Sequence, residues 1–302
     1  MTLVEGSINR HMIIAGVEVD AASGGRFDRE SPAHGSVVAS YPDADARDVD
    51  AAVQAARAAF DAGPWPRLAA ADRAKALTRV AELIRRDADD LAVLEVMESG
   101  KPIGQARDEV EGVAGLWEYA ASLGRHAYGD AHSGLGADML AMVIREPLGV
   151  TAMITPWNFP LLIVSQKLPF ALAVGCTAVV KPSELTPGTT VRLAQLCTEA
   201  GIPPGVVNVI TGAEVAGAAL CEHPGVNMIS FTGSTAVGRL VAATAGRHLK
   251  RVELELGGKN PQIVFPDASL EAAVDAIVFG IYFNQGECCN SGSRVLDRKS
   301  VV

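Results

Sequence analysis

Short β-rich segments and longer helical segments alternate from residue 150 to residue 256, and no other feature of the chain constrains its fold as strongly. The β-rich segments are dominated by Val, Ile and Thr, and the segments between them carry apolar residues at helical spacing. We expect strands at 150–154, 177–180, 206–210, 228–231 and 251–254, and helices at 160–174, 188–200, 213–221 and 235–245. Strict alternation of this kind predicts βαβ units, and therefore an α/β fold in which helices flank a parallel sheet.

The residues before this series differ in character. Residues 17–42 contain short extended pieces and turns, and apolar residues at helical spacing follow at 45–60, around 77–84, at 87–98 and at 105–124. Between 129 and 147 the pattern changes to glycines and the apolar run Met139–Arg145, which predicts an exposed ribbon. We therefore expect one α/β domain built from 1–128 and 148–257, interrupted by a hairpin at 129–147, and a new segment that begins at 258.

Charge and composition exclude several classes of protein. The chain of 302 residues carries a formal net charge of −9 and has no basic run, so a nucleic-acid-binding surface is not expected. Its longest apolar stretch, 168–180, falls short of the roughly 20 residues that span a bilayer, and the N-terminus lacks the apolar segment of a secretory signal. Five cysteines without a CxxC pair, and the lack of an HExxH motif, argue against a metal site and favour the reducing cytoplasm.

A glycine-framed turn after an expected strand predicts phosphate binding. The segment Phe231–Gly238 reads FTGSTAVG, so Gly233 and Gly238 frame the start of a helix, with Ser234 and Val237 in between. Glycine permits close approach of a phosphate, and a helix N-terminus offers free N–H groups. In a Rossmann-like sheet, ligands bind beyond the carboxyl ends of the strands, where this turn lies. The alternative is an ordinary strand-to-helix turn, and the lack of a Lys-Ser/Thr pair excludes a P-loop.

Polar residues follow a second expected strand, which ends at Val180. Lys181, Ser183 and Glu184 stand at its end, and the Glu184 carboxylate is suited to accept hydrogen bonds from ribose hydroxyls. The same carboxylate would repel a 2′-phosphate, so it favours NAD over NADP. The alternative is that Glu184 is an acid placed favourably at a helix start.

Two further strand ends carry groups suited to carbonyl chemistry. Asn158 lies in a loop that two prolines restrict, and its amide is a candidate donor to an oxyanion; the alternative is an ordinary turn asparagine. Glu255 precedes two glycines, where its carboxylate could face a low-dielectric cavity as a general base; the alternative is a solvent-facing residue. Lys167 is expected inside the helix 160–174, where it either orients the Asn158 loop or is solvated.

Cys288 and Cys289 are adjacent in a polar, glycine-flanked loop, which is not the usual setting of an inert buried thiol. A cysteine in such a loop is a candidate nucleophile, although a single cysteine is more often inert. Cys176, Cys197 and Cys221 lie on apolar faces, and we interpret them as small core residues.

Taken together, these segments resemble the aldehyde dehydrogenase superfamily. The motifs TPWNFP at 155–160, KPSELTP at 181–187, FTGSTAVG at 231–238, ELGGKNP at 255–261 and NQGECCNSGSR at 284–294 occur in the family's order and at its spacing. Each motif alone is weak, whereas five in order are specific, and the resemblance extends to about Leu296. It implies NAD or NADP as cofactor, a small aldehyde as substrate, and a homo-dimer or homo-tetramer for the full-length enzyme.

The resemblance also implies roles for individual residues. The family's nucleophile matches Cys289, its general base matches Glu255, and its oxyanion donors match the Asn158 amide and the Cys289 backbone N–H. Positions of the family's cofactor site match Ile154, Trp157, Lys181, Ser183, Glu184, Phe231, Gly233, Ser234, Val237, Gly238 and Leu256. The implied reaction is attack of the Cys289 thiolate on the aldehyde, hydride transfer that leaves a thioester, and hydrolysis by water that Glu255 activates. A retained Glu255 favours release of a free carboxylic acid.

The chain departs from the family in length and at its end. Much of the family's catalytic domain is missing, so 258–302 is expected to be only the start of that domain. The tail DRKSVV at 297–302 does not continue the expected apolar strand, and its codons can be written to match a sequencing adapter, so we interpret the chain as truncated near Leu296. We expect the hairpin and the segment after 258 to expose apolar surface, and the isolated chain to be an inactive fragment that at most binds a dinucleotide.

Overall fold

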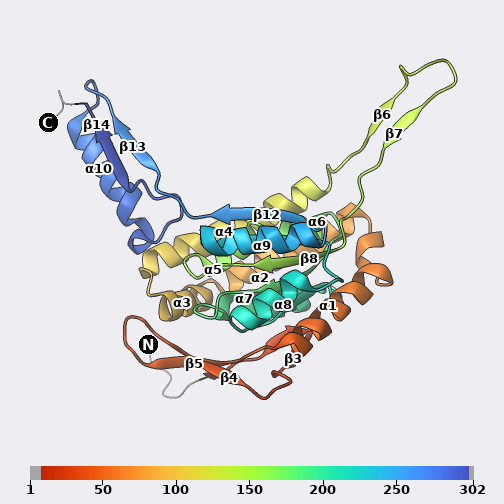
Figure 1. Cartoon of the computed structure of the whole chain (residues 1–302), viewed down its shortest axis with the longest axis horizontal. Coiled ribbons are helices and arrows are strands. Elements are labelled where there is room, and N and C mark those ends of the chain that lie inside the picture. Colours follow the sequence, from red (N-terminus) through yellow and green to blue (C-terminus); the bar gives the residue numbers. More distant parts are fainter. Residues whose placement is uncertain (1–7, 299–302) are drawn as a thin grey trace.

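The computed structural model describes residues 8–298, and at its centre lies one seven-stranded sheet (Figure 1). Its parallel part consists of β12 (Arg251–Leu256), β11 (Met228–Gly233), β8 (Val150–Ile154), β9 (Thr177–Lys181) and β10 (Val207–Val209), in that order. The antiparallel strands β2 (Met12–Ile14) and β3 (Val17–Val19) extend it beyond β10. The parallel sheet expected for residues 150–256 is therefore confirmed.

Helices cover both faces of this sheet, because alternate residues of its central strands point to opposite sides. In β8, Val150, Ala152 and Ile154 enter one core and Met153 enters the other. The first face is covered by α1 (Ala46–Asp61), α8 (Glu214–Glu222) and α9 (Thr235–Arg247). The second is covered by α2 (Ala70–Arg86), α3 (Ala88–Ser99), α4 (Ile103–Gly124), α5 (Pro160–Ser165), α6 (Leu168–Ala173) and α7 (Gly188–Glu199), with η1 (Trp65–Arg67) beside them. Helices on both sides explain why β8 and β9 are buried along their whole length and consist mainly of apolar residues.

The single helix expected at 160–174 is wrong, because the chain breaks there into α5 and α6. Pro169 has no backbone N–H, and its ring would clash with the carbonyl of the preceding turn, so it is accommodated in the first turn of a new helix that begins at Leu168. Lys167 therefore lies at the break and not inside a helix. Its Nζ is 3.1 Å from Glu253 Oε2 on β12, and the Lys167 side chain is 7% exposed.

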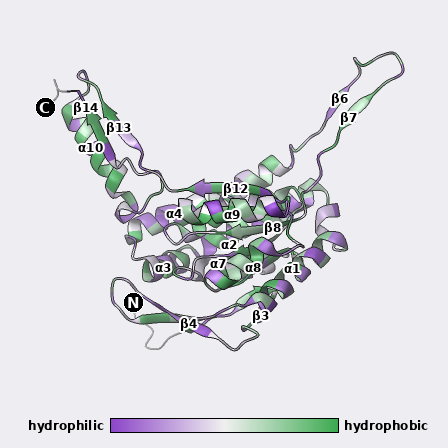
Figure 2. Ribbon diagram, in the orientation of Figure 1, coloured by the Kyte–Doolittle hydropathy of each residue, from purple (hydrophilic) through white to green (hydrophobic). Residues whose placement is uncertain are grey.

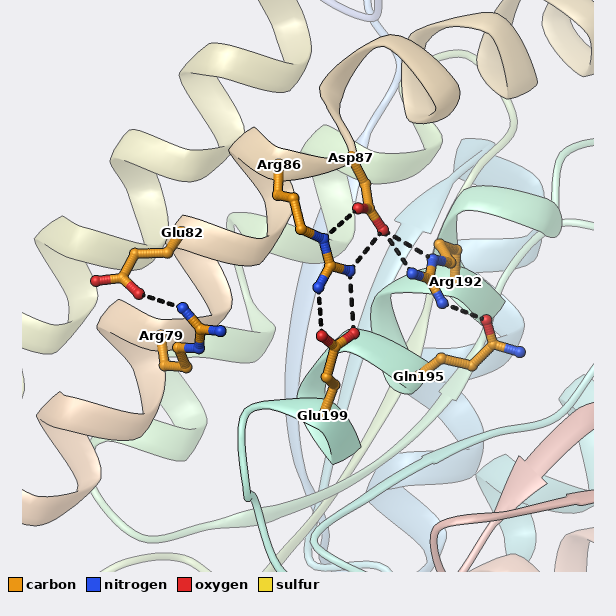
Figure 3. A network of polar contacts seen from close by, with 7 residues as sticks. All are labelled: Arg79, Glu82, Arg86, Asp87, Arg192, Gln195 and Glu199. Carbon is orange, nitrogen blue, oxygen red and sulfur yellow. Dashed lines mark hydrogen bonds and ion pairs between the residues drawn. The ribbon is translucent and has the colours of Figure 1, made fainter.

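A surface network of charged side chains joins α2 and α3 to α7 (Figure 3). Asp87, at the junction of α2 and α3, accepts hydrogen bonds from Arg86 and from Arg192, and Arg86 also pairs with Glu199. Hydrogen bonding from Arg86, and then from Arg192, lowers the pKa of Asp87 to about 2 against the opposing effect of burial. The network therefore ties the turn between two helices to a third helix.

Within residues 8–298, three small sheets lie outside the central one. Near the N-terminus, β1 (Ile8–Asn9), β5 (Val37–Pro42) and β4 (Arg26–Glu30) pair, and β6 (Asp130–His132) with β7 (Ala141–Val143) forms the hairpin expected at 129–147. The C-terminal segment comprises β13 (Pro261–Val264), α10 (Leu270–Tyr282), η2 (Phe283–Gly286) and β14 (Arg294–Asp297). The strand β14 pairs in parallel with β13, and residues 299–302 of the tail lie outside the described residues.

The hairpin and the C-terminal segment project from the body as two arms (Figure 1), and apolar residues lie along both (Figure 2). Met142 and Ile144 are 65% and 76% exposed on the hairpin, and none of the residues of α10 is buried. This agrees with the exposed apolar surface expected for both segments. Within residues 8–298, no helix combines the length and the apolar character needed to cross a bilayer.

Candidate active site

The carboxyl ends of the central parallel strands bring the expected cofactor residues to one edge of the sheet. Ile154 at the end of β8 pairs in register with Phe231 and Lys181, and Gly233 pairs with Leu256. Residues that are far apart in the sequence thus become neighbours because parallel strands end at the same edge.

Three segments meet at this edge around Asn158. The Asn158 Nδ2 donates to the Glu287 carbonyl at 2.6 Å, and the Asn284 Nδ2 donates to the Asn158 carbonyl at 2.9 Å. The backbone N–H of Gly258, just after β12, donates to the Cys289 carbonyl at 3.1 Å. The loop after β8, the turn after β12 and the segment 283–290, which we call the cysteine segment, are therefore held together by hydrogen bonds.

The backbone of the cysteine segment turns sharply before the two thiols. Asn284, Gln285 and Gly286 have φ of 48°, 62° and 81°, a left-handed conformation that costs little for glycine and is tolerated by asparagine. Asn284 is 1% exposed, and its N–H donates to the Gln105 side chain on α4 at 3.2 Å. Sequence reasoning gave Asn284 no role, although asparagine beside glycine is a signal for such a turn.

The two adjacent thiols differ in their surroundings. Cys289 is exposed, whereas Cys288 is half-buried with its Sγ 3.6 Å from the Phe283 carbonyl. Burial, and next the neighbouring Cys289, raise the pKa of the Cys288 thiol. Both thiols line a cavity of about 820 Å³ between α4, α5 and the C-terminal segment. The more accessible Cys289 is therefore the better placed of the two to meet a substrate. As expected, Cys176, Cys197 and Cys221 are buried.

Glu255 lies at the penultimate position of β12, in register with Thr232 of β11. Its side chain is exposed in this structure, so the expected low-dielectric cavity does not surround it. After Leu256 the chain leaves the central sheet and continues into the C-terminal arm (Figure 1).

Some of the polar groups around Lys181 already form hydrogen bonds within the chain. The Lys181 Nζ donates to the carbonyls of Pro182 and Gly212 at 3.0 and 2.6 Å and lies 3.8 Å from Glu184 Oε2. Burial lowers the pKa of Lys181. Ser183 Oγ accepts from a backbone N–H two residues later, and the Glu184 side chain is 45% exposed. Glu184 is therefore the group of this set that is free to receive a ligand hydroxyl.

The helix α9 begins where the phosphate turn was expected. Ser234 caps it, with its Oγ accepting from the Val237 N–H at 3.3 Å. A Cβ on Gly238 would lie 2.6 Å from Leu256 Cδ2, so this glycine lets α9 pack closely on β12. Trp157 and Val237 remain 38% and 44% exposed and leave the edge open.

The edge fits a dinucleotide. It offers the N-terminus of a thirteen-residue helix, an exposed carboxylate at Glu184, and two buried hydroxyls, Thr155 Oγ1 and Thr232 Oγ1, that have no hydrogen-bond partner. Among residues 8–298, no cluster of His, Cys, Asp and Glu is arranged to hold a metal ion.

Sequence reasoning missed a group of buried charges behind this edge. The side chains of Glu95 on α3 and of Lys101, which lies between α3 and α4, are 0% exposed, and that of Glu109 on α4 is 6% exposed. The sequence does place these charged residues next to apolar positions of the expected helices. Helical spacing alone, however, does not show which charged side chain points into the core.

Comparison with known proteins defines the family. The sequence model of the protein family described as "Aldehyde dehydrogenase family" matches residues 19–302, and the chain belongs to this family. It is 52% identical to an NAD-dependent aldehyde dehydrogenase from Sinorhizobium meliloti, covering 98% of this chain and 59% of that structure with a TM-score of 0.96. An aldehyde dehydrogenase from Bacillus cereus in an NAD+ complex is 39% identical, with 98% and 60% coverage and a TM-score of 0.95.

Among curated relatives, Betaine aldehyde dehydrogenase 1 of Oryza sativa subsp. japonica is 43% identical, and the match covers 97% of this chain and 59% of the relative. The chain thus spans about three fifths of the length of the proteins that it matches.

Proposed function

We propose that this chain is part of an NAD(P)-dependent enzyme that oxidises an aldehyde to a carboxylic acid, with Cys289, Glu255 and Asn158 as catalytic residues. The observation that carries the proposal is the junction of three segments, in which the Asn158 amide, the Cys289 backbone and the turn after Glu255 are joined by hydrogen bonds. These are the groups needed to form a covalent adduct, hold its oxyanion and hydrolyse it.

Each residue has a distinct task in the proposed reaction. The Cys289 thiolate attacks the aldehyde carbon, and the Asn158 amide with the Cys289 N–H stabilises the oxyanion of the thiohemiacetal. A bound nicotinamide supplies the hydride acceptor that allows the thioester to form. Glu255 removes a proton from water that attacks the thioester, which releases the acid and restores the thiol. In this structure the Asn158 Nδ2 donates one N–H to the Glu287 carbonyl, and its second N–H is the donor proposed for the oxyanion.

The cofactor proposed is NAD, with NADP as the second possibility. The exposed Glu184 carboxylate supports NAD, because it suits free ribose hydroxyls and repels a 2′-phosphate. Residues 154, 157, 181, 183, 184, 231, 233, 234, 237, 238 and 256 are proposed to hold it, within a cofactor domain built from 1–128 and 148–257.

Two further features are proposed from the surface and the thiols. The exposed apolar hairpin at 129–147 supports a homo-dimer or homo-tetramer of the full-length enzyme. Five free cysteines within one chain support a reducing compartment such as the cytoplasm.

The test uses the full-length protein, NAD+ and a panel of neutral, aromatic and charged aldehydes, with NADH formation as the readout. We expect Cys289→Ala to abolish turnover and Cys288→Ala, its matched control, to retain it. Glu255→Gln is expected to release NADH in a single burst without turnover, since the thioester forms but is not hydrolysed. NADH formation that survives Cys289→Ala would contradict the proposal.

A second possibility concerns the 302-residue chain alone. Because the C-terminal arm leaves Glu255 and Cys289 open to solvent, the chain is proposed to bind the dinucleotide without turning over aldehyde. A calorimetric titration with NAD+ and the NADH assay, both on the 302-residue chain, distinguish a binding fragment from an active enzyme. NAD+ binding without turnover supports the binding fragment, and aldehyde-dependent NADH production contradicts it.

A further inference from the structure

Behind the cysteine segment, two carboxyl groups and one ammonium group are buried together. The Lys101 Nζ pairs with Glu109 Oε2 and lies 3.6 Å from Glu95 Oε2. All three side chains are at least nine-tenths buried. Two ionised carboxylates and one lysine would leave a net negative charge without solvent, which is strongly unfavourable.

The hydrogen bonds of this cluster are incomplete in one respect. Glu95 Oε2 and Glu109 Oε1 are both buried without a hydrogen-bond partner. Two ionised carboxylates cannot hydrogen-bond to each other, whereas one proton between them turns one oxygen into a donor and satisfies both. Burial first, and then the charge of Glu109, raise the pKa of Glu95 to about 8, in agreement with a proton retained at neutral pH.

The cluster is attached to the loop that carries Asn158. Glu95 Oε1 accepts from the Leu161 N–H at 3.1 Å. The Lys101 Nζ lies 4.8 Å from the centre of the Phe159 ring, the residue next to Asn158. Glu95 and Lys101 therefore both contact the short stretch that follows Asn158.

The same cluster is attached to the cysteine segment. The Phe159 ring stacks on Phe283 with centroids 6.3 Å apart. The Gln285 side-chain amide donates to the Gly100 carbonyl at 2.9 Å and accepts from the Lys101 N–H at 3.3 Å. The positive charge of Lys101 also acts on the pKa values of Glu287 and Cys288, lowering them against the larger effect of burial.

We propose that Glu95, Lys101 and Glu109 form one unit that shares a single proton between its carboxyl groups and positions both Asn158 and the cysteine segment. They are positioning residues, and the inference rests on the proposed function for its chemical purpose. The ionisable groups on which the charges of the unit act are Glu287 and Cys288 of the cysteine segment, while α5 contributes the Leu161 N–H.

The shared proton is tested by infrared spectroscopy of the 302-residue chain. Glu98 is a second buried carboxyl group, so every sample carries Glu98→Gln. We expect the carbonyl band of a protonated carboxylic acid at neutral pH, its loss in Glu95→Gln, and its retention in Glu111→Gln, which changes an exposed carboxylate on the same helix as Glu109. A band that persists in Glu95→Gln, or no band at all, overturns the proposal.

The positioning is tested by alkylation of Cys289 with iodoacetamide in a Cys288→Ser chain across a range of pH. We expect Glu95→Ala to change the rate by about tenfold, since it leaves buried groups unpaired. Glu95→Gln mimics the protonated carboxyl group, so its alkylation rate at neutral pH should equal that of the parent. The parent should show an inflection of the rate near pH 8 in addition to the one caused by thiol ionisation, and Glu95→Gln should lack it.

Equal pH–rate profiles for the parent, Glu95→Ala and Glu111→Gln would refute the positioning role. Because Glu95→Gln preserves size and packing, it keeps the test decisive even if Glu95→Ala does not fold. Neither experiment uses aldehyde turnover, so a chain that passes both while the full-length protein oxidises no aldehyde would refute only the proposed function.

Discussion

Glu98 of α3 provides a sharp test of how burial sets stability in this chain. Its carboxyl group is fully buried and accepts hydrogen bonds from the Tyr41 hydroxyl and from the Gly188 N–H, the latter at 2.9 Å. Burial raises the pKa of Glu98 to about 7, against the lowering effect of these hydrogen bonds and of Arg29. The side chain is thus an ionisable group in the core, and the cations that act on its pKa are Arg29 and Arg10.

The size of the effect follows from this pKa. A rise from 4.5 to about 7 means that the folded chain binds the proton more tightly than the unfolded chain. One pKa unit corresponds to about 1.4 kcal/mol, so ionising Glu98 lowers the free energy of unfolding by about 3 kcal/mol. The stability that the protonated form provides is complete below the unfolded pKa and is lost as the pH rises through about 7.

The substitution Glu98→Gln should remove this pH dependence. The glutamine carbonyl can accept from the Gly188 N–H, and its amide can donate to the Tyr41 oxygen, so the packing is kept. Urea unfolding of both chains at about pH 5 and about pH 8 measures the difference, which we expect to shift by about 2–3 kcal/mol in favour of the variant at the higher pH. Glu82→Gln, an exposed change on α2, serves as the control and should show no such shift. A Glu98→Gln difference that stays constant within about 0.5 kcal/mol would refute the reasoning.

Three further predictions follow from the packing and the surface network. Asp87→Asn weakens the contacts to Arg86 and Arg192, and we expect it to lower the free energy of unfolding by about 1 kcal/mol near neutral pH. Urea unfolding of both chains should show this difference disappear as the pH falls from about 4 toward 2, where Asp87 becomes protonated. Asn227→Ala removes the acceptor of the Val150 N–H and of Arg57, and denaturant unfolding should show a free energy of unfolding that is lower by about 1–3 kcal/mol. A decrease smaller than that caused by an alanine substitution at an exposed position would contradict this expectation. Gly238→Val pushes against Leu256, so we expect α9 to shift from β12 and NAD+ affinity measured by calorimetry to fall at least about tenfold, with Gly246→Ala on the open side of α9 unchanged.

The sequence predicted the sheet and most of the edge residues because their signals are local. Strand composition, helical spacing and the glycines at 233 and 238 each reflect a few neighbouring residues, and the strands and helices formed close to where they were expected. The prediction of one helix at 160–174 failed because a proline inside an apolar run can either bend or end a helix, and only tertiary packing decides which.

What the sequence determined by itself is the order of the strands along the chain, the alternation that buries them from both sides, and the motifs that identify the family. The tertiary structure alone decided which charged residues are buried, that Lys167 pairs with Glu253, and that Asn158 meets the cysteine segment through Glu287 and Asn284. The physical reason is that apolar periodicity is written in consecutive residues, whereas a hydrogen bond or a buried ion pair depends on distances between segments that only the assembled sheet brings together.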